Sequence, residues 1–123
     1  MRVLIADDDS LMRTLLVVSL GAMGVAETVE AGDGDEAWQM LQDRPFDLAI
    51  IDWHMPGKTG LELVRDVRAR GSQIPILMVT AEAARAQVLE ALQAGATDYL
   101  IKPFENEVLW TKLNKLYARV SRR

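Results

Sequence analysis

The segment FDLAIIDWHMPGKTG, residues 46–60, contains a short apolar run that ends in a single carboxylate. The run LAII, residues 48–51, directly precedes Asp52, with the turn-forming Pro45 before it and Pro56 and Gly57 after it. A short apolar run bounded by turn residues is typical of a strand that is buried on both faces. Such a strand presents its last residue at the carboxyl edge of a sheet, where open α/β sheets bind ligands. Asp52 is therefore the first candidate for a functional residue.

The rest of the chain repeats this strand and the helical pattern that follows it. The other predicted strands cover residues 3–6, 25–30, 74–79 and 98–101. Ser10 and Thr59 are expected to cap the first and third helices, the fourth helix is expected over residues 83–94, and the fifth from about Glu105. Five alternating strands and helices imply right-handed crossovers and one doubly wound parallel sheet. We expect a single α/β domain over residues 1–123, frayed from about residue 121.

The composition excludes several classes of function. The net charge of −4 provides no basic stripe, which argues against direct nucleic-acid binding. Without cysteine there is no disulfide, no thiolate metal site and no cysteine nucleophile. No apolar run approaches the roughly 18 residues of a membrane span, and the acidic N-terminus is unlike a signal peptide. We expect a cytoplasmic protein that does not contact membranes.

Four predicted strands end in residues that can take part in chemistry, namely Asp7 with Asp8, Asp52, Thr80 and Lys102. Because parallel strands place their carboxyl ends at one edge, these side chains are expected to meet there. Two carboxylates about 4 Å apart repel each other by on the order of 4 kcal/mol at an effective dielectric constant near 20. A hard divalent cation offsets that repulsion, and Mg²⁺ suits a half-open site with oxygen ligands.

The same residues suit a phosphoryl group. A cation would neutralise its charge, Lys102 could pair with its oxygens, and Thr80 could donate a hydrogen bond to it. Carboxylates act as nucleophiles in aspartyl-phosphate chemistry. The residues therefore predict Mg²⁺-dependent acceptance of a phosphoryl group on an aspartate.

Four segments, in this order and at this spacing, resemble the receiver domain of bacterial two-component response regulators, in particular the stand-alone chemotaxis type. They are LIADDDSLMR, IIDWHMPGKTGLELV, VTAE and AGATDYLIKPF, and the resemblance extends from Val3 to about Val120. It implies a flavodoxin-like fold with strand order 2-1-3-4-5 and five helices, a topology for which the chemotaxis receiver is itself a standard example.

The resemblance also implies a role for each site residue. Asp52 would be the phosphoacceptor, receiving the phosphoryl group from the phosphohistidine of a sensor histidine kinase or phosphotransfer protein. Asp8, Asp52 and the backbone carbonyl of His54 would ligate Mg²⁺ directly, and Asp7 would act through water. Lys102 would contact the phosphoryl group.

Further roles follow from the same resemblance. Thr80 and Tyr99 would form a switch in which the hydroxyl moves toward the phosphoryl group and the ring then turns inward. The bond between Lys102 and Pro103 is expected to be cis. His54 and Glu82 would set the lifetime of the acyl phosphate. Thr59 replaces the aspartate of many receivers, a change expected to affect only the helix cap, and Trp53 is expected to be exposed over the site.

Phosphorylation adds a charge of about −1.5 to −2, and Thr80 and Lys102 are the hydrogen-bond donors that can move toward the new phosphoryl oxygens. Both residues end strands that lead into the last two helices. The face formed by residues 83–94, 98–101 and the helix from Glu105 is therefore expected to shift between two packings and bind a downstream protein. The chain would catalyse only its own phosphoryl transfer and slow autodephosphorylation. It holds no output domain, so it is either a single-domain regulator or part of a longer chain of undetermined oligomeric state.

Other readings of these residues exist. Asp7-x-Asp9 followed by Thr80 and Lys102 loosely resembles a haloacid-dehalogenase-like phosphohydrolase with Asp7 as nucleophile, but that family would leave Asp52 idle. A third class is an interaction module that works without phosphorylation. Taken alone, the Asp7–Asp9 run is more typical of a helix-capping turn, and Tyr99 could be a half-buried strand residue that does not switch.

Overall fold

The computed structural model describes residues 1–121 as five strands that alternate with five helices. The elements are β1 (Arg2–Ala6), α1 (Ser10–Ala22), β2 (Glu27–Ala31), α2 (Gly34–Asp43), β3 (Leu48–Ile51), α3 (Gly60–Ala69), β4 (Ile76–Thr80), α4 (Arg85–Ala94), β5 (Asp98–Ile101) and α5 (Asn106–Ser121). Residue 121, where fraying was expected to begin, ends α5, and residues 122–123 lie outside the described part of the chain. None of the described helices is long and apolar enough to cross a bilayer.

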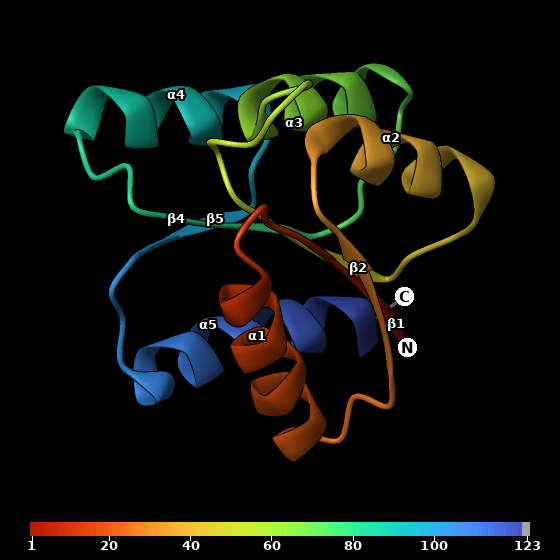
Figure 1. The fold of residues 1–123 in the computed structure, drawn as a ribbon, viewed down its shortest axis with the longest axis vertical. Helices are drawn as coiled ribbons and strands as arrows, with labels where there is room; N and C mark the ends of the chain where they lie inside the picture. Colours follow the sequence, from red (N-terminus) through yellow and green to blue (C-terminus); the bar gives the residue numbers. More distant parts are fainter. Residues whose placement is uncertain (122–123) are drawn as a thin grey trace.

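The five strands form one sheet in the order β2-β1-β3-β4-β5, and every neighbouring pair is parallel. Helices α2, α3 and α4 cover one face of the sheet, and α1 and α5 cover the other (Figure 1). The predicted doubly wound fold and strand order are confirmed. The carboxyl ends of all five strands consequently lie at one edge, and the amino ends at the opposite edge.

The core consists of two apolar layers, one on each face of the sheet. In β1, Leu4 and Ala6 belong to the layer under α2, α3 and α4, whereas Val3 and Ile5 belong to the layer under α1 and α5. This division follows from the strand geometry, because successive side chains point to opposite faces. Burial on both faces explains why the central strands are continuous apolar runs without alternating polar residues.

Several predicted boundaries differ from the structure, and the fourth strand covers Ile76–Thr80 instead of residues 74–79. Asp9, not Ser10, caps α1, because its Oδ1 accepts hydrogen bonds from the backbone N–H groups of Leu11 and Met12 at 3.0 and 3.4 Å. β2 begins at Glu27 because the N–H of Val25 still donates to Leu20, which closes the end of α1. α4 begins at Arg85, after a cap residue without a side-chain hydrogen bond, and not at residue 83.

The predicted cap of α3 is present. The N–H of Thr59 donates to Glu62 Oε1 at 3.0 Å, and the N–H of Glu62 donates to Thr59 Oγ1 at 3.1 Å, which completes a capping box. Such reciprocal bonds satisfy two donors that a helix start leaves free. They fix the point at which the loop after Asp52 becomes a helix.

Candidate functional site

Three carboxylates converge at the carboxyl edge of the central strands. One oxygen each from Asp7, Asp8 and Asp52 lies within 4.8 Å of the others. The parallel register pairs Ala6 of β1 with Ile51 of β3, so the residues that follow these two strands are neighbours. The N–H of Asp52 continues the ladder by donating to the carbonyl of Ala6 at 2.9 Å. The sheet register therefore creates the acidic group from residues about 45 positions apart in the chain.

Burial differs among the three carboxylates. Asp7 and Asp52 are only 2% and 7% exposed, whereas Asp8 is open to solvent. The Oδ1 atom of Asp52 is buried and has no hydrogen-bond partner among the described residues. An unsatisfied buried acceptor costs free energy, and such a group calls for an explanation such as a bound ion. This atom, together with the exposed Asp8, fits a hard cation with oxygen ligands that keeps part of its water shell.

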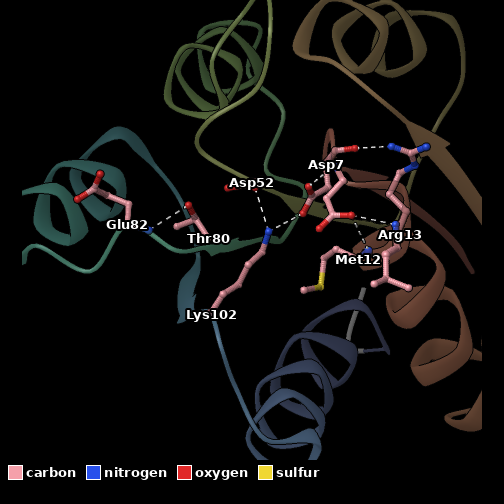
Figure 2. A network of polar contacts seen from close by, with 9 residues as sticks. Asp7, Met12, Arg13, Asp52, Thr80, Glu82 and Lys102 are labelled. Carbon is pink, nitrogen blue, oxygen red and sulfur yellow. Dashed lines mark hydrogen bonds and ion pairs between the residues drawn. The ribbon is translucent and has the colours of Figure 1, made fainter.

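Lys102 joins the two buried carboxylates. Its Nζ donates to Asp7 Oδ2 at 2.8 Å and to Asp52 Oδ2 at 3.0 Å, reaching between them from the end of β5 (Figure 2). Burial acts to lower the pKa of the Lys102 ammonium, but the hydrogen bonds to both carboxylates outweigh it and raise that pKa above its ordinary value. The ammonium is thus held in its charged form beside the acidic group.

Asp7 is the most enclosed member of the group. Burial raises the pKa of the Asp7 carboxyl above its ordinary value, although hydrogen bonds from Lys102 and from the N–H of Asp9 act in the opposite direction. The charge of Asp52 contributes a further rise. The two buried carboxylates therefore repel each other in this structure, as the sequence analysis anticipated.

Thr80 ends β4 and is fully buried. Its Oγ1 accepts a hydrogen bond from the N–H of Glu82 at 3.3 Å, and its backbone carbonyl accepts one from the N–H of Lys102 at 2.8 Å. The hydroxyl proton has no acceptor among the described residues. Thr80 thus has a free donor while it is attached to the loop between β4 and α4 (Figure 2).

The ring of Tyr99 is turned inward in this structure, where it is 7% exposed and packs in the layer under α3 and α4. Its hydroxyl donates to the backbone carbonyl of Glu82 at 2.6 Å. Burial, followed by the charges of Glu82 and Asp52, raises the pKa of Tyr99 to about 12. The inward position that the resemblance assigns to the phosphorylated form is therefore already occupied.

His54 and Glu82 contact each other directly. His54 Nε2 lies 3.1 Å from Glu82 Oε2, and the imidazole is mostly exposed while the carboxylate is partly covered. The pair bridges the two loops that follow Asp52 and Thr80. The ligand role of the His54 backbone carbonyl stays a prediction.

Two features of the chain backbone shape the loops around the site. The Lys102–Pro103 peptide bond is cis, the isomer that the resemblance implies. At Gly60, a Cβ atom would collide with the backbone of Asp52 and Trp53, so α3 begins closer to the residues after β3 than any other residue would allow. Trp53 is 8% exposed and packs in the core, so the expectation of an indole exposed over the site is wrong.

Sequence reasoning missed Arg13. Its Nη1 donates to the backbone carbonyl of Asp7 at 2.7 Å, and its Nε pairs with Glu30 Oε1 at 3.1 Å. Through these contacts Arg13, on α1, fixes the loop that follows β1. The position one helical turn after Asp9 was the only available signal, and it did not distinguish Arg13 from a solvated surface cation.

Comparison with known proteins was consistent over nearly the whole chain. Residues 3–114 match the sequence profile of the family described as "Response regulator receiver domain". The chain is 47% identical to the chemotaxis protein CheY of Pseudomonas aeruginosa over 123 residues, which cover 98% of this chain and 99% of that protein. It is 43% identical to chemotaxis protein CheY-3 of Vibrio cholerae over 122 residues, or 98% and 94% of the two chains.

Solved structures show the same similarity in three dimensions. The receiver domain of the Francisella response regulator 1452 superposes with a TM-score of 0.89 at 32% identity, covering 96% of this chain and 97% of the other. A CheY-like receiver domain protein from Methanospirillum hungatei superposes with a TM-score of 0.90 at 26% identity, covering 98% and 96%.

Proposed function

Because this chain belongs to the response regulator receiver domain family, we propose that it accepts a phosphoryl group on Asp52 and signals through protein contacts. The observation that carries this proposal is the position of Asp52. Its carboxylate lies within 4.8 Å of Asp7 and Asp8, accepts a hydrogen bond from Lys102 on one oxygen, and has the other oxygen free.

The proposed donor is the phosphohistidine of a sensor histidine kinase or of a phosphotransfer protein. A carboxylate oxygen of Asp52 forms a bond to phosphorus, the phosphorus–nitrogen bond breaks, and the electron pair leaves with the histidine nitrogen. Lys102 is charged and stays within reach of the new phosphoryl oxygens. Asp8, Asp52 and the backbone carbonyl of His54 would hold Mg²⁺ directly and Asp7 through water, and the ion would add positive charge beside those oxygens.

Hydrolysis of the acyl phosphate would end the signal. Water attacks the phosphorus, and the Asp52 carboxylate is regenerated with release of inorganic phosphate. His54 and Glu82 lie on the two loops beside Asp52 and Thr80, and we propose that their contact sets the rate of this slow step. No substrate other than the chain's own phosphoryl group is turned over in this scheme.

Signal output in this proposal passes through Glu82. Thr80 has a free hydroxyl proton that can turn to a phosphoryl oxygen, and its Oγ1 is attached to the N–H of Glu82. The carbonyl of the same Glu82 accepts from Tyr99. Phosphorylation would thus bias the loop between β4 and α4 and favour the inward ring that the structure already has.

The proposed output surface is the face of α4, β5 and α5. Several apolar side chains on these elements are exposed to solvent, namely Leu89, Leu92, Ile101, Val108 and Trp110. Contiguous exposed apolar groups are typical of surfaces that bind other proteins, and we propose that these side chains form such a surface. The net charge of −4 favours a protein target over nucleic acid.

The phosphohydrolase alternative is less well supported. Its nucleophile, Asp7, is 2% exposed, and its two oxygens already accept hydrogen bonds from the N–H of Asp9 and from Lys102. A nucleophile needs an oxygen that is not already bonded, and of these two buried carboxylates only that of Asp52 has one, its Oδ1.

Intact mass spectrometry after incubation with acetyl phosphate and Mg²⁺ tests the proposal. We expect a labile adduct with the mass of one phosphoryl group that is absent from the Asp52→Asn variant. Asp9→Asn is the matched control, because it removes a neighbouring carboxylate outside the three-carboxylate group, and asparagine retains the helix cap. An adduct that persists in Asp52→Asn would refute the assignment of the phosphoacceptor.

A further inference from the structure

A groove lies at the edge of the sheet opposite the acidic group. It has a volume of about 360 Å³ and is formed by the last turns of α2 and α3 and by the chain leading into β3 and β4. The two helices lie side by side on the same face of the sheet (Figure 1). Volumes of roughly 300–1,000 Å³ are typical of small-molecule sites. None of the residues assigned to phosphoryl transfer lines this groove, so it is separate from the proposed function.

Apolar side chains form part of the groove wall, beside Ser72 and two arginines. They are those of Trp38, Leu41, Phe46, Val67 and Ile74. Val67 and Ile74 belong to the core, whereas Trp38, Leu41 and Phe46 are half-buried and leave part of their surface to the groove. A ligand that fills this space gains stability from the removal of apolar surface from water.

Two guanidinium groups stand at the rim. Arg44 follows the end of α2 and Arg70 follows the end of α3, and both line the groove. Within residues 1–121 neither arginine forms a salt bridge. No described carboxylate lines the groove either. The groove therefore carries an unpaired double positive charge in a protein whose net charge is −4.

Nearby carboxylates are already engaged. Asp43, beside Arg44, accepts a hydrogen bond from Gln39 Nε2 at 2.9 Å, and Asp66 on α3 is paired with Lys58. The local structure thus leaves the two arginines available for an external anion.

The cation nearest the apolar wall is held in place. The guanidinium of Arg70 lies over the Trp38 ring, 5.6 Å from its centroid, and Lys58 Nζ lies 5.5 Å from the same centroid. Cation–π contacts of this kind restrict both the ring and the charged group while the N–H donors at the guanidinium edge stay free. Such an arrangement is preorganised for a carboxylate, which arginine binds through two parallel hydrogen bonds.

We propose that this groove binds a small amphipathic acid, an aryl or indolyl carboxylate, with its ring between α2 and α3 and its carboxylate on Arg44 and Arg70. A fully polar anion would leave the apolar walls without contact, and a neutral aromatic compound would leave both arginines unpaired. The combination of walls and rim thus favours a ligand with one apolar ring and one negative charge.

Titration with indole-3-propionate, followed by ¹H–¹⁵N spectra of the tryptophan side chains, tests this site. The chain contains three tryptophans. We expect saturable shifts of the Trp38 indole signal and none of those of Trp53 or Trp110, with a Kd on the order of 1 mM from the size of the probe. The uncharged analogue indole-3-propionamide should bind about tenfold more weakly, because it lacks the charge that pairs with arginine. No shift of Trp38, or equal binding of the amide, would overturn the proposal.

Charge-removing variants locate the carboxylate. The double variant Arg44→Gln/Arg70→Gln changes two exposed side chains and should bind indole-3-propionate at least about tenfold more weakly. This is roughly the effect of losing charge-assisted hydrogen bonds. Arg65→Gln is the matched control on α3, because Arg65 pairs with Glu90 outside the groove, and it should bind as the parent does. The amide spectra of each variant verify that it is folded. Unchanged affinity in the double variant would place the probe elsewhere and refute the site, whereas phosphorylation of Asp52 is tested independently by mass.

Discussion

The hydroxyl of Tyr99 donates to the backbone carbonyl of Glu82 at 2.6 Å, which ties β5 to the loop that follows Thr80. The backbone N–H of the same Glu82 donates to Thr80 Oγ1, and its carboxylate contacts His54 Nε2. One residue of the loop between β4 and α4 therefore contacts three of the residues implicated in phosphoryl chemistry. Glu82 thus contacts Thr80 and Tyr99 through its backbone and His54 through its side chain.

The ionisation of Tyr99 should make the protein less stable in alkali. The pKa of Tyr99 is raised to about 12 in the folded state, from an ordinary value of 10.0. Because the folded-state pKa is the higher one, the corresponding stabilisation is present below pH 10 and is lost as the pH rises toward 12. At pH 11 the loss is about 1 kcal/mol in the free energy of unfolding.

Urea unfolding at pH 9 and pH 11 measures this loss, with Tyr99→Phe as the comparison. The variant lacks the titrating hydroxyl and should lose correspondingly less stability between the two pH values. Lys102 also has a raised pKa and titrates in alkali, but it is present in both proteins and cancels in the difference. Equal losses in the two proteins would show that the Tyr99 hydroxyl is not held as the structure has it.

The stabilisation of the protein by Mg²⁺ should depend on Asp8. Asp8 belongs to the three-carboxylate group and is exposed, so Asp8→Asn should fold normally in metal-free buffer. Wild type should gain about 2.7 kcal/mol at a Mg²⁺ concentration 100 times the Kd, and the variant much less, because binding to the folded state alone stabilises it. Thermal unfolding with and without Mg²⁺ measures the gain. Asp9→Asn serves as the control and should gain as much stability from Mg²⁺ as the wild type. An equal gain in Asp8→Asn would contradict the metal site.

Removal of the Lys102 ammonium should destabilise the metal-free protein. Lys102→Gln leaves the buried carboxylates of Asp7 and Asp52 without their cation, a loss on the order of 2 kcal/mol. Mg²⁺ should restore part of the loss because it neutralises the same carboxylates. Lys112→Gln is the control, since it breaks a more exposed pair with Asp98 and should cost less than about 1 kcal/mol. Urea unfolding compares the two, and equal costs would contradict the prediction.

The contact between His54 and Glu82 should slow the hydrolysis of the acyl phosphate. The pair bridges the loops after Asp52 and Thr80, and its loss should give water easier access to the phosphoryl group. His54→Ala and Glu82→Ala should each accelerate dephosphorylation, and the double variant should be no faster than either, because both remove the same contact. Loss of the acyl phosphate over time, followed by intact mass, gives the rates. Additive effects would show that the two residues act separately.

Much of the architecture followed from short-range patterns. Apolar runs such as that before Asp52 mark strands buried on both faces, and their alternation with helical segments predicts a parallel sheet. Once the strands are parallel, the residues that follow β1, β3, β4 and β5 must lie at one edge. The meeting of Asp7, Asp52 and Lys102 was therefore predictable, although they are as many as 95 positions apart. Boundaries were less accurate, because Ser10 and Asp9 are both acceptable caps and the backbone around them decides between them.

Which residues end the strands, and thus which chemical groups gather at the carboxyl edge, is readable from the amino-acid order, since strand runs and their alternation with helices are local patterns. How these groups are bonded to one another is a property of the folded molecule. Four features depend on the packing of side chains from distant segments. They are the unbonded oxygen of Asp52, the hydrogen bond from Arg13 to the Asp7 carbonyl, the burial of Trp53, and the groove beside Arg44 and Arg70. Such packing depends on side-chain shapes and distances in three dimensions, and these cannot be predicted from the spacing of residues along the chain.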